Sequence, residues 1–163
     1  NYMYVDVGGG STEVNLLIKG ELVCSKSYNI GTVRMLNDAV DFEEWKRLEA
    51  DMKTLSENYL GTNIIGSGGN INKLYRLAEK TDKKRQRISV IVLKSLYEKL
   101  KLLSFEERMQ VFNLKPDRAD VIVPASEIFL TIAEILHSEY IYVPVIGLAD
   151  GIIDGLYAAN RNR

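Results

Sequence analysis

The sequence contains very few residues that bind metals through nitrogen or sulfur. Its 163 residues include one cysteine, Cys24, and one histidine, His137. One residue of each kind cannot build the usual zinc site. Cys24 lies in an apolar stretch with no base beside it, so we interpret it as a small buried residue rather than a nucleophile. We interpret His137, after an apolar helical segment, as a helix-end histidine.

An excess of positive charge is also missing. The 21 Lys and Arg against 22 Asp and Glu give a formal net charge of −1. Proteins that bind nucleic acids are usually basic, and no aromatic and basic residues alternate here as on a nucleic-acid platform, so this class is disfavoured. The basic run at 80–87 could guide a polyanion by electrostatic attraction. Such runs are more often solvated loops, which is the interpretation we favour.

Long apolar runs are absent as well. No stretch approaches the roughly 20 apolar residues of a membrane helix, and no signal peptide opens the sequence. With 46% hydrophobic and 26% charged residues, the chain is expected to be a soluble, cytoplasmic domain without a membrane partner. A core-like strand at 3–7 begins two residues after the start, as in a fragment cut at a domain boundary. We therefore expect residues 1–163 to be one lobe of a longer protein.

Short apolar segments bounded by glycine and polar turns predict β-strands. The first three are joined by short turns, which predicts an antiparallel meander at the start of the chain. The five segments predicted to be strands are 3–7, 13–18, 22–30, 62–65 and 140–146.

Apolar residues spaced by three or four predict helices between and after the later strands. The first helix begins with Asp41 and Glu44, which resemble a capping box, and Asn70 can cap the second. The helix within 119–136 is apolar nearly all round and must be buried. Strands followed by helices predict an α/β domain, a mixed sheet with helices on its faces. The six predicted helices are 41–59, 70–79, 89–103, 105–112, one within 119–136, and 151–160.

The clearest chemical signal is a run of three glycines between the first two predicted strands. Successive glycines permit positive φ angles and a close approach of the backbone to a ligand. Their N–H groups can form a concavity that binds an anion. A plain hairpin needs only a two-residue turn, so this loop is richer in glycine than a turn requires. The residues predicted to bind phosphate here are Gly8, Gly9, Gly10, Ser11 and Thr12.

The residues around this loop support the same prediction. Ser11 and Thr12 offer hydroxyl donors to phosphate oxygens. Asp6, at the end of its strand, is placed to hold a hydrated Mg²⁺, which prefers one or two carboxylates plus phosphate oxygens. The loop lacks the Gly-Lys-Ser/Thr ending of a Walker loop and the strand-turn-helix setting of a dinucleotide fingerprint.

A second glycine loop runs from a predicted strand into a predicted helix, whose N-terminal N–H groups attract anions. Alone it fits an ordinary strand-helix turn equally well. Since both glycine loops follow strands, we expect them to line the same edge of the sheet. The residues of this loop predicted to bind phosphate are Gly66, Ser67, Gly68, Gly69 and Asn70.

Three further segments, 31–36, 118–125 and 147–152, accompany the two loops at 6–13 and 66–70. In this order, the five segments resemble counterparts in the exopolyphosphatase / guanosine-pentaphosphate phosphatase (Ppx/GppA) family. The resemblance implies a ribonuclease-H-like lobe of the actin-like ATPase fold, namely the second, C-terminal lobe of a two-lobe enzyme. The block from Arg118 onward is more specific to the family than the first loop, which would also suit actin-like ATPases.

Membership of that family would imply Mg²⁺-dependent removal of terminal phosphate from polyphosphate or guanosine pentaphosphate, with water as the nucleophile. Asp6 would contact metal or phosphate, and Glu13 would lie near the metal or the attacking water as a catalytic residue. The family's proposed catalytic base is a glutamate upstream, in the other lobe. We therefore expect the chain to need its own N-terminal lobe as a partner and to be catalytically silent alone. The resemblance also leaves room for a homodimer.

Two other functions remain open at this stage. An ATP-binding member of the actin and sugar-kinase superfamily shares the first loop, and its second loop would contact adenosine. A sensor of the alarmone nucleotide would bind its ligand without hydrolysis. Arg34 could reach a phosphate, although an arginine near a helix start is more often a surface charge.

Overall fold

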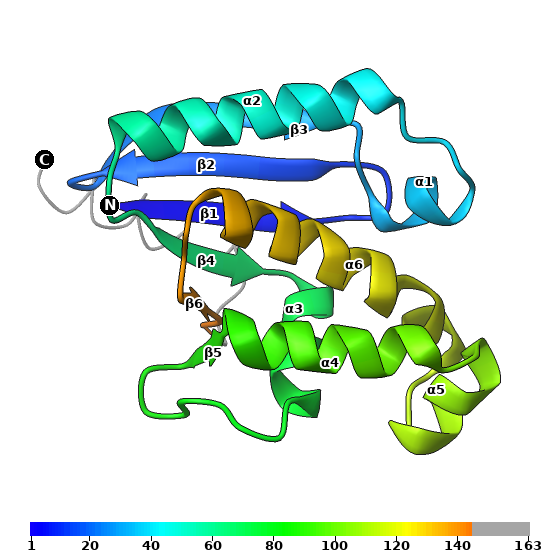
Figure 1. Cartoon of the computed structure of the whole chain (residues 1–163). Helices are drawn as coiled ribbons and strands as arrows, with labels where there is room; N and C mark the ends of the chain where they lie inside the picture. Colours follow the sequence, from blue (N-terminus) through cyan, green and yellow to red (C-terminus); the bar gives the residue numbers. More distant parts are fainter. Residues whose placement is uncertain (145–163) are drawn as a thin grey trace, which may run out of the picture.

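A computed structural model describes residues 1–144 and shows a mixed sheet with helices packed against it (Figure 1). Within these residues the sheet has six strands in the order β3-β2-β1-β4-β6-β5. The first three pair antiparallel, β4 runs parallel to β1 and β6, and β5 runs antiparallel to β6. The predicted meander and α/β class are confirmed. The strands are β1 Tyr2–Val7, β2 Thr12–Ile18, β3 Glu21–Tyr28, β4 Asn63–Ser67, β5 Arg87–Ser89 and β6 Tyr140–Tyr142.

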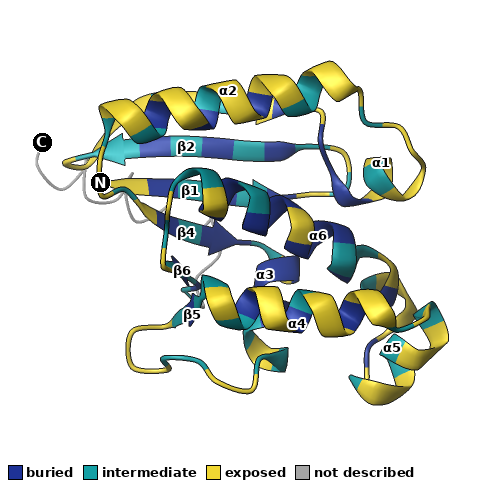
Figure 2. Cartoon of the chain, in the orientation of Figure 1, coloured by how far each residue is buried: buried dark blue, intermediate teal, exposed yellow. Residues whose placement is uncertain are grey.

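Three long helices lie side by side in front of the sheet in Figure 1, with α6 between α2 and α4. α6 begins at a proline, Pro116, whose missing N–H is not needed in the first helical turn. Its apolar residues are mostly buried, which confirms the predicted buried helix. Figure 2 shows α6 with buried, intermediate and exposed positions along its length. The described helices are α1 Thr32–Leu36, α2 Phe42–Asn58, α3 Gly69–Leu77, α4 Val90–Leu102, α5 Phe105–Val111 and α6 Pro116–Ile135.

The core lies between α6 and one face of the sheet. Along β1 the side chains of Met3, Val5 and Val7 are buried, and the residues between them are partly exposed. This period of two places Asp6 on the opposite face of the strand from Val5 and Val7. No helix within residues 1–144 has the length and apolarity needed to cross a membrane.

The start of α2 differs from the predicted capping box. Asp41 does cap the helix, and its carboxylate accepts a hydrogen bond from the N–H of Glu43. Glu44, however, does not bond back to the N–H of Asp41 but accepts from the N–H of Asn29 at 2.8 Å. The capping box was therefore a wrong prediction, because Glu44 is taken up by a neighbouring segment of the chain.

The start of α3 also differs from prediction. Gly68 precedes the helix, and Asn70 lies within its first turn instead of capping it. Two short elements, α1 and β5, were not predicted, and the third strand ends at Tyr28 rather than at residue 30. The predicted helix at 151–160, the end of the strand at 140–146 and the segment 147–152 lie outside the described residues.

Candidate functional site

The two glycine loops lie next to each other at the carboxyl ends of β1 and β4. These strands pair in parallel, with Asp6 beside Ser67. A Cβ atom on Gly68 would stand 2.8 Å from the Oδ1 atom of Asp6, so the loops approach each other closely. Gly68 also has φ +98°, a region that favours glycine. The prediction that both loops line one edge of the sheet is confirmed.

The carbonyl groups of the first loop face α1. The N–H of Thr32 donates to the oxygen of Gly8, and the N–H of Val33 donates to the oxygen of Gly9, both at 3.0 Å. The first N–H groups of a helix have no partner within the helix. Here the first N–H groups of α1 donate to the carbonyl oxygens of the loop, and these hydrogen bonds hold the loop in place.

The N–H groups of the same loop are left without partners. Gly8 donates to the carbonyl of Ser11 at 2.9 Å, but nothing in residues 1–144 accepts from the N–H of Gly9, Gly10 or Ser11. Arg34 donates from Nε to the oxygen of Gly10 at 2.6 Å, which binds the third carbonyl as well. A loop with bound carbonyls and free successive N–H groups is suited to an anion.

The structural reason for the three glycines is only partly the predicted one. None of Gly8, Gly9 and Gly10 has a positive φ angle, so the expectation of left-handed backbone here is wrong. Close packing explains two of them. A Cβ atom on Gly8 would lie 3.3 Å from the oxygen of Ser11, and one on Gly9 would lie 3.1 Å from Cγ2 of Val33.

The two hydroxyl groups after the glycines already donate within the protein. Ser11 Oγ donates to Oε1 of Glu13 at 2.9 Å. Thr12 Oγ1 donates to the carbonyl of Ile30 at 2.7 Å, and the Thr12 side chain is fully buried. In this arrangement Thr12 anchors the strand, and a phosphate contact from Thr12 remains a prediction.

Asp6 and Glu13 form a pair of carboxylates beside the loop. They lie opposite each other on β1 and β2, and therefore project from the same face. Burial and, to a lesser extent, the nearby Glu13 charge raise the pKa of Asp6. Within residues 1–144 no hydrogen bond or ion pair reaches the Asp6 carboxylate. Such a pair is stabilised when a divalent cation binds between the charges.

The donor set fits Mg²⁺. This ion takes oxygen ligands and is usually bound through one or two carboxylates together with phosphate oxygens and water. Asp6 and Glu13 supply the two carboxylates next to the loop with free N–H groups. No three His, Cys, Asp or Glu side chains in the described part of the chain are grouped to hold a metal without further ligands.

The second loop is packed more tightly than the first. A Cβ atom on Gly66 would lie 2.8 Å from Cγ1 of Ile71, and one on Gly69 would overlap the guanidinium of Arg118. The hydroxyl oxygen of Ser67 is buried and has no hydrogen-bond partner among residues 1–144. It is therefore a polar group of this loop that a ligand could satisfy.

Arg118 contacts the second loop, although the sequence pattern predicts no role for it. Its Nη1 donates to Oδ1 of Asn70 at 2.9 Å, and Nδ2 of Asn70 donates to the carbonyl of Val7 at 3.3 Å. The Asn70 amide thus joins α3 and α6 to the end of β1. The signal for Arg118 was its position in the family-like segment 118–125, just as that for Arg34 was segment 31–36.

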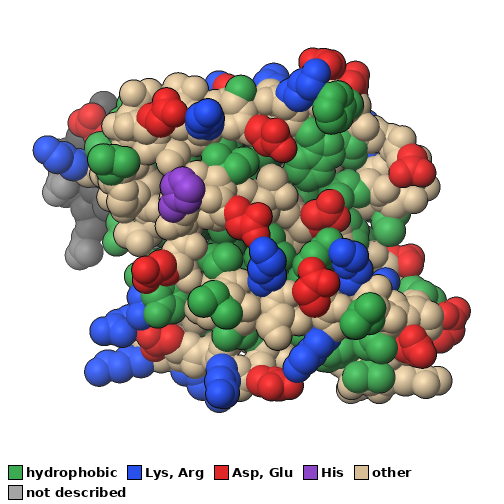
Figure 3. All heavy atoms as spheres, in the orientation of Figure 1, with side chains coloured by type: hydrophobic (Ala, Val, Ile, Leu, Met, Phe, Trp, Pro, Cys, Tyr) green, Lys and Arg blue, Asp and Glu red, His purple; other side chains and the backbone are tan. Residues whose placement is uncertain are grey.

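Three other features of the sequence do not join this site. Cys24 is partly buried against the core on β3, and His137 follows the end of α6. In the basic run, Asp82 pairs with Arg85 and Arg87. Figure 3 shows Lys and Arg side chains gathered at the lower left, where Figure 1 draws the segment before β5.

The chain is similar to known proteins over most of its length. The family model described as the Ppx/GppA phosphatase family matches residues 1–159. A curated relative, the bifunctional 3-dehydroquinate synthase/phosphatase of Fusobacterium nucleatum, is 26% identical over 160 residues. That match covers 88% of this chain and 24% of the relative.

Two solved structures have a similar fold. The Ppx/GppA family member of Aquifex aeolicus is 27% identical with a TM-score of 0.73, covering 98% of this chain and 56% of that one. The exopolyphosphatase of Cytophaga hutchinsonii is 19% identical with a TM-score of 0.76, covering 97% and 57%. The chain thus has the fold of one part of these proteins and spans little more than half of their length.

Proposed function

The chain belongs to the Ppx/GppA phosphatase family, and from this membership we propose that its protein removes terminal phosphate from inorganic polyphosphate or guanosine pentaphosphate. One observation carries the proposal. The loop between β1 and β2 has its three glycine carbonyls bound from α1, while the N–H groups of Gly9, Gly10 and Ser11 have no acceptor in residues 1–144. These N–H groups would bind the oxygens of a phosphate group.

The carboxylates of Asp6 and Glu13 would hold Mg²⁺ beside that phosphate. When bound, the ion neutralises negative charge on the phosphate oxygens, which is most of what phosphoryl transfer requires from an enzyme. Without a cation, two adjacent carboxylates would repel a polyanion. The requirement for Mg²⁺ therefore follows from the same pair that forms the site.

In the proposed reaction, the oxygen of a water molecule bonds to the terminal phosphorus and the bond from phosphorus to the bridging oxygen breaks. Water supplies one proton to the shortened product and leaves its hydroxyl on the released phosphate. Glu13 would orient this water or the metal. The family's proposed base belongs to the other lobe. Residues 1–163 alone would therefore bind the phosphate groups of the substrate but would not hydrolyse it at a useful rate.

The test is phosphate release by the whole parent protein with Mg²⁺, offered long-chain polyphosphate, guanosine pentaphosphate and ATP in parallel. Release from either of the first two, with ATP spared and the 163-residue chain inert, is the expected result. The Asp6→Asn variant of the parent protein tests the role of the carboxylate and should lose activity by at least about a hundredfold, as for other electrostatic catalytic groups. Preferred consumption of ATP, or tight alarmone binding without any release, would refute the proposal.

A further inference from the structure

The carboxylate of Glu13 is held by two hydroxyl groups on the same oxygen. Ser11 Oγ donates to Oε1 of Glu13 at 2.9 Å, and Ser27 Oγ donates to the same atom at 2.8 Å. Ser27 lies directly opposite Glu13 on the neighbouring strand β3. One donor therefore reaches Glu13 from the glycine loop and the other from β3, and together they restrict the rotation of the Glu13 side chain.

The other carboxylate oxygen of Glu13 is left free by this arrangement. Nothing within residues 1–144 donates a hydrogen bond to Oε2. A carboxylate fixed through one oxygen presents the second in a defined direction to a metal ion or a water molecule. Glu13 would lose this direction if one of the two hydroxyls were removed.

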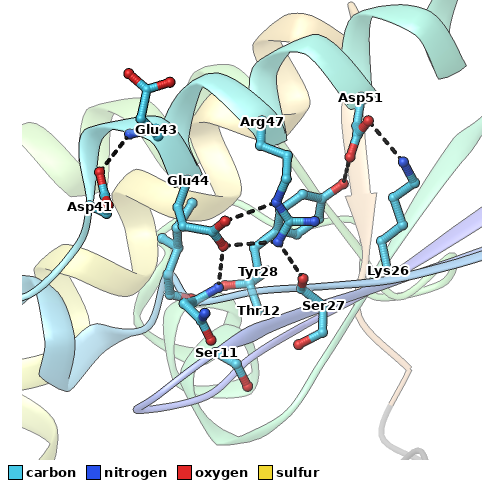
Figure 4. Close-up of polar contacts among 12 residues, drawn as sticks. Ser11, Thr12, Lys26, Ser27, Tyr28, Asp41, Glu43, Glu44, Arg47 and Asp51 are labelled. Atoms are coloured by element: carbon cyan, nitrogen blue, oxygen red, sulfur yellow. Dashed lines mark hydrogen bonds and ion pairs between the residues drawn. The ribbon is translucent and has the colours of Figure 1, made fainter.

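Ser27 is itself held by α2, as Figure 4 shows. Nη2 of Arg47 donates to the carbonyl of Ser27 at 2.7 Å, and the N–H of Asn29 donates to Oε2 of Glu44 at 2.8 Å. Arg47 and Glu44 pair with each other at 2.9 Å. The end of β3 is thus bound to α2 by two side chains that also bind each other.

The residue between these contacts anchors the strand in the core. Tyr28 is fully buried, and its hydroxyl donates to Asp51 at 2.8 Å. The guanidinium of Arg47 lies 4.5 Å from the centre of the Tyr28 ring. Ser27 therefore projects toward Glu13 from a backbone fixed on its other side, which is what a positioning residue requires.

We propose that Ser27 is a positioning residue for Glu13, holding Oε1 so that Oε2 is directed toward the divalent cation or the attacking water. The role of the cation and the water rests on the proposed function. The alternative is an ordinary cross-strand hydrogen bond that only stabilises the sheet. Ser25 separates the two cases, since it lies on the same strand two residues away, is exposed and faces Asn15.

The experiment compares Ser27→Ala, Ser27→Thr and Ser25→Ala in the whole parent protein. Ser27→Ala should raise the Mg²⁺ concentration for half-maximal phosphate release, or lower kcat, by about tenfold, the lower end of such outer-shell effects. The KM for polyphosphate should be unchanged. Ser27→Thr keeps a hydroxyl and should restore most of the loss, whereas Ser25→Ala should match the wild type.

A second measurement does not depend on turnover. Binding of Mn²⁺, as a paramagnetic substitute for Mg²⁺, is titrated by electron paramagnetic resonance. Ser27→Ala should weaken Mn²⁺ binding about tenfold relative to Ser25→Ala. If the wild-type protein released no phosphate but the two variants differed in Mn²⁺ affinity in this way, the proposed function would be refuted and the positioning role supported. Equal Mn²⁺ affinities of the two alanine variants would refute the positioning role, whatever the activity.

Discussion

The two glycine loops lie side by side, yet their glycines serve different physical needs. A Cβ atom on Gly10 in the first loop would meet nothing within 4 Å. In the second loop, a Cβ atom on Gly66 would lie 2.8 Å from Ile71, and one on Gly69 would overlap Arg118. The first loop is open at Gly10 and has N–H groups without a partner in residues 1–144, whereas the second loop brings α3 close to the sheet. A glycine-rich motif can thus be required for binding or for packing.

The polar groups of the two loops differ in the same way. Asn70 and Arg118 in and beside the second loop bond to each other, and Asn70 bonds to the end of β1. The N–H groups at the tip of the first loop have no partner in the described residues. Substitutions in the second loop should therefore mainly lower the free energy of unfolding, whereas comparable substitutions in the first loop should mainly weaken ligand binding.

The largest difference is expected between Gly66→Ala and Gly10→Ala. Alanine at 66 adds a methyl group 2.8 Å from Cγ1 of Ile71 in the core, and overpacking of this kind costs about 2–3 kcal/mol. Alanine at 10 faces open space and should change the free energy of unfolding by less than about 0.5 kcal/mol. Denaturant unfolding of both variants measures this difference. Equal costs would mean that the loops are packed alike.

A smaller loss is expected for Asn70→Ala. The change removes the donor to Val7 O and the acceptor of Arg118, and unsatisfied buried groups cost about 1–2 kcal/mol. Hydrogen exchange at the end of β1 should become faster, because α3 would no longer be bonded to that strand. The control is Asn72→Ala, two residues further along α3, since the Asn72 side chain makes no hydrogen bond within residues 1–144. An unfolding free energy for Asn70→Ala like that of Asn72→Ala would show that the link carries little energy.

Much of this geometry follows from the sequence, because strand order determines which loops meet. Two strands that pair in parallel end at the same edge, so the predicted strands before Gly8 and Gly66 suffice to bring their loops together. The buried α6 follows in the same way from its apolar residues. These features depend on patterns that are repeated over many residues.

The missing parts depend on single tertiary contacts. α1 has five residues and no side-chain cap, and its first N–H groups bond to the carbonyls of Gly8 and Gly9. No local pattern predicts a helix that is stabilised by another loop. The Arg118 contact with Asn70 spans 48 residues of sequence, and that of Ser27 with Glu13 spans 14. Such pairs become visible only when the strands and helices are placed.

A change of opposite sign is expected for Asp6→Asn, in the open part of the site. Burial raises the pKa of Asp6, so the folded state disfavours its charge, and stability falls as pH rises through that pKa. Removing the charge should therefore raise the melting temperature slightly at pH 7 without Mg²⁺. Added Mg²⁺ should raise the wild-type melting temperature but not that of the variant. A variant that melts below the wild type without metal would contradict this account of Asp6.

The smallest effect is expected for Glu44→Gln, which tests how firmly β3 is held behind the open loop. Bonds from Arg47 and from the N–H of Asn29 lower the pKa of Glu44 to about 2 from 4.5. A lowered carboxyl pKa means that its contribution is complete above about pH 4.5 and is lost as pH falls through about 2. The difference in the free energy of unfolding between wild type and Glu44→Gln should therefore shrink as pH falls from about 4.5 to about 2. The control is Glu43→Gln, which removes a neighbouring charge that does not bond to Asn29 or Arg47. Because Arg47 is exposed and Glu44 is only partly buried, solvent screens the pair and the difference stays small. The variant also tests the site. If the end of β3 positions Ser27, Glu44→Gln should weaken Mn²⁺ binding even though it lowers the free energy of unfolding only slightly.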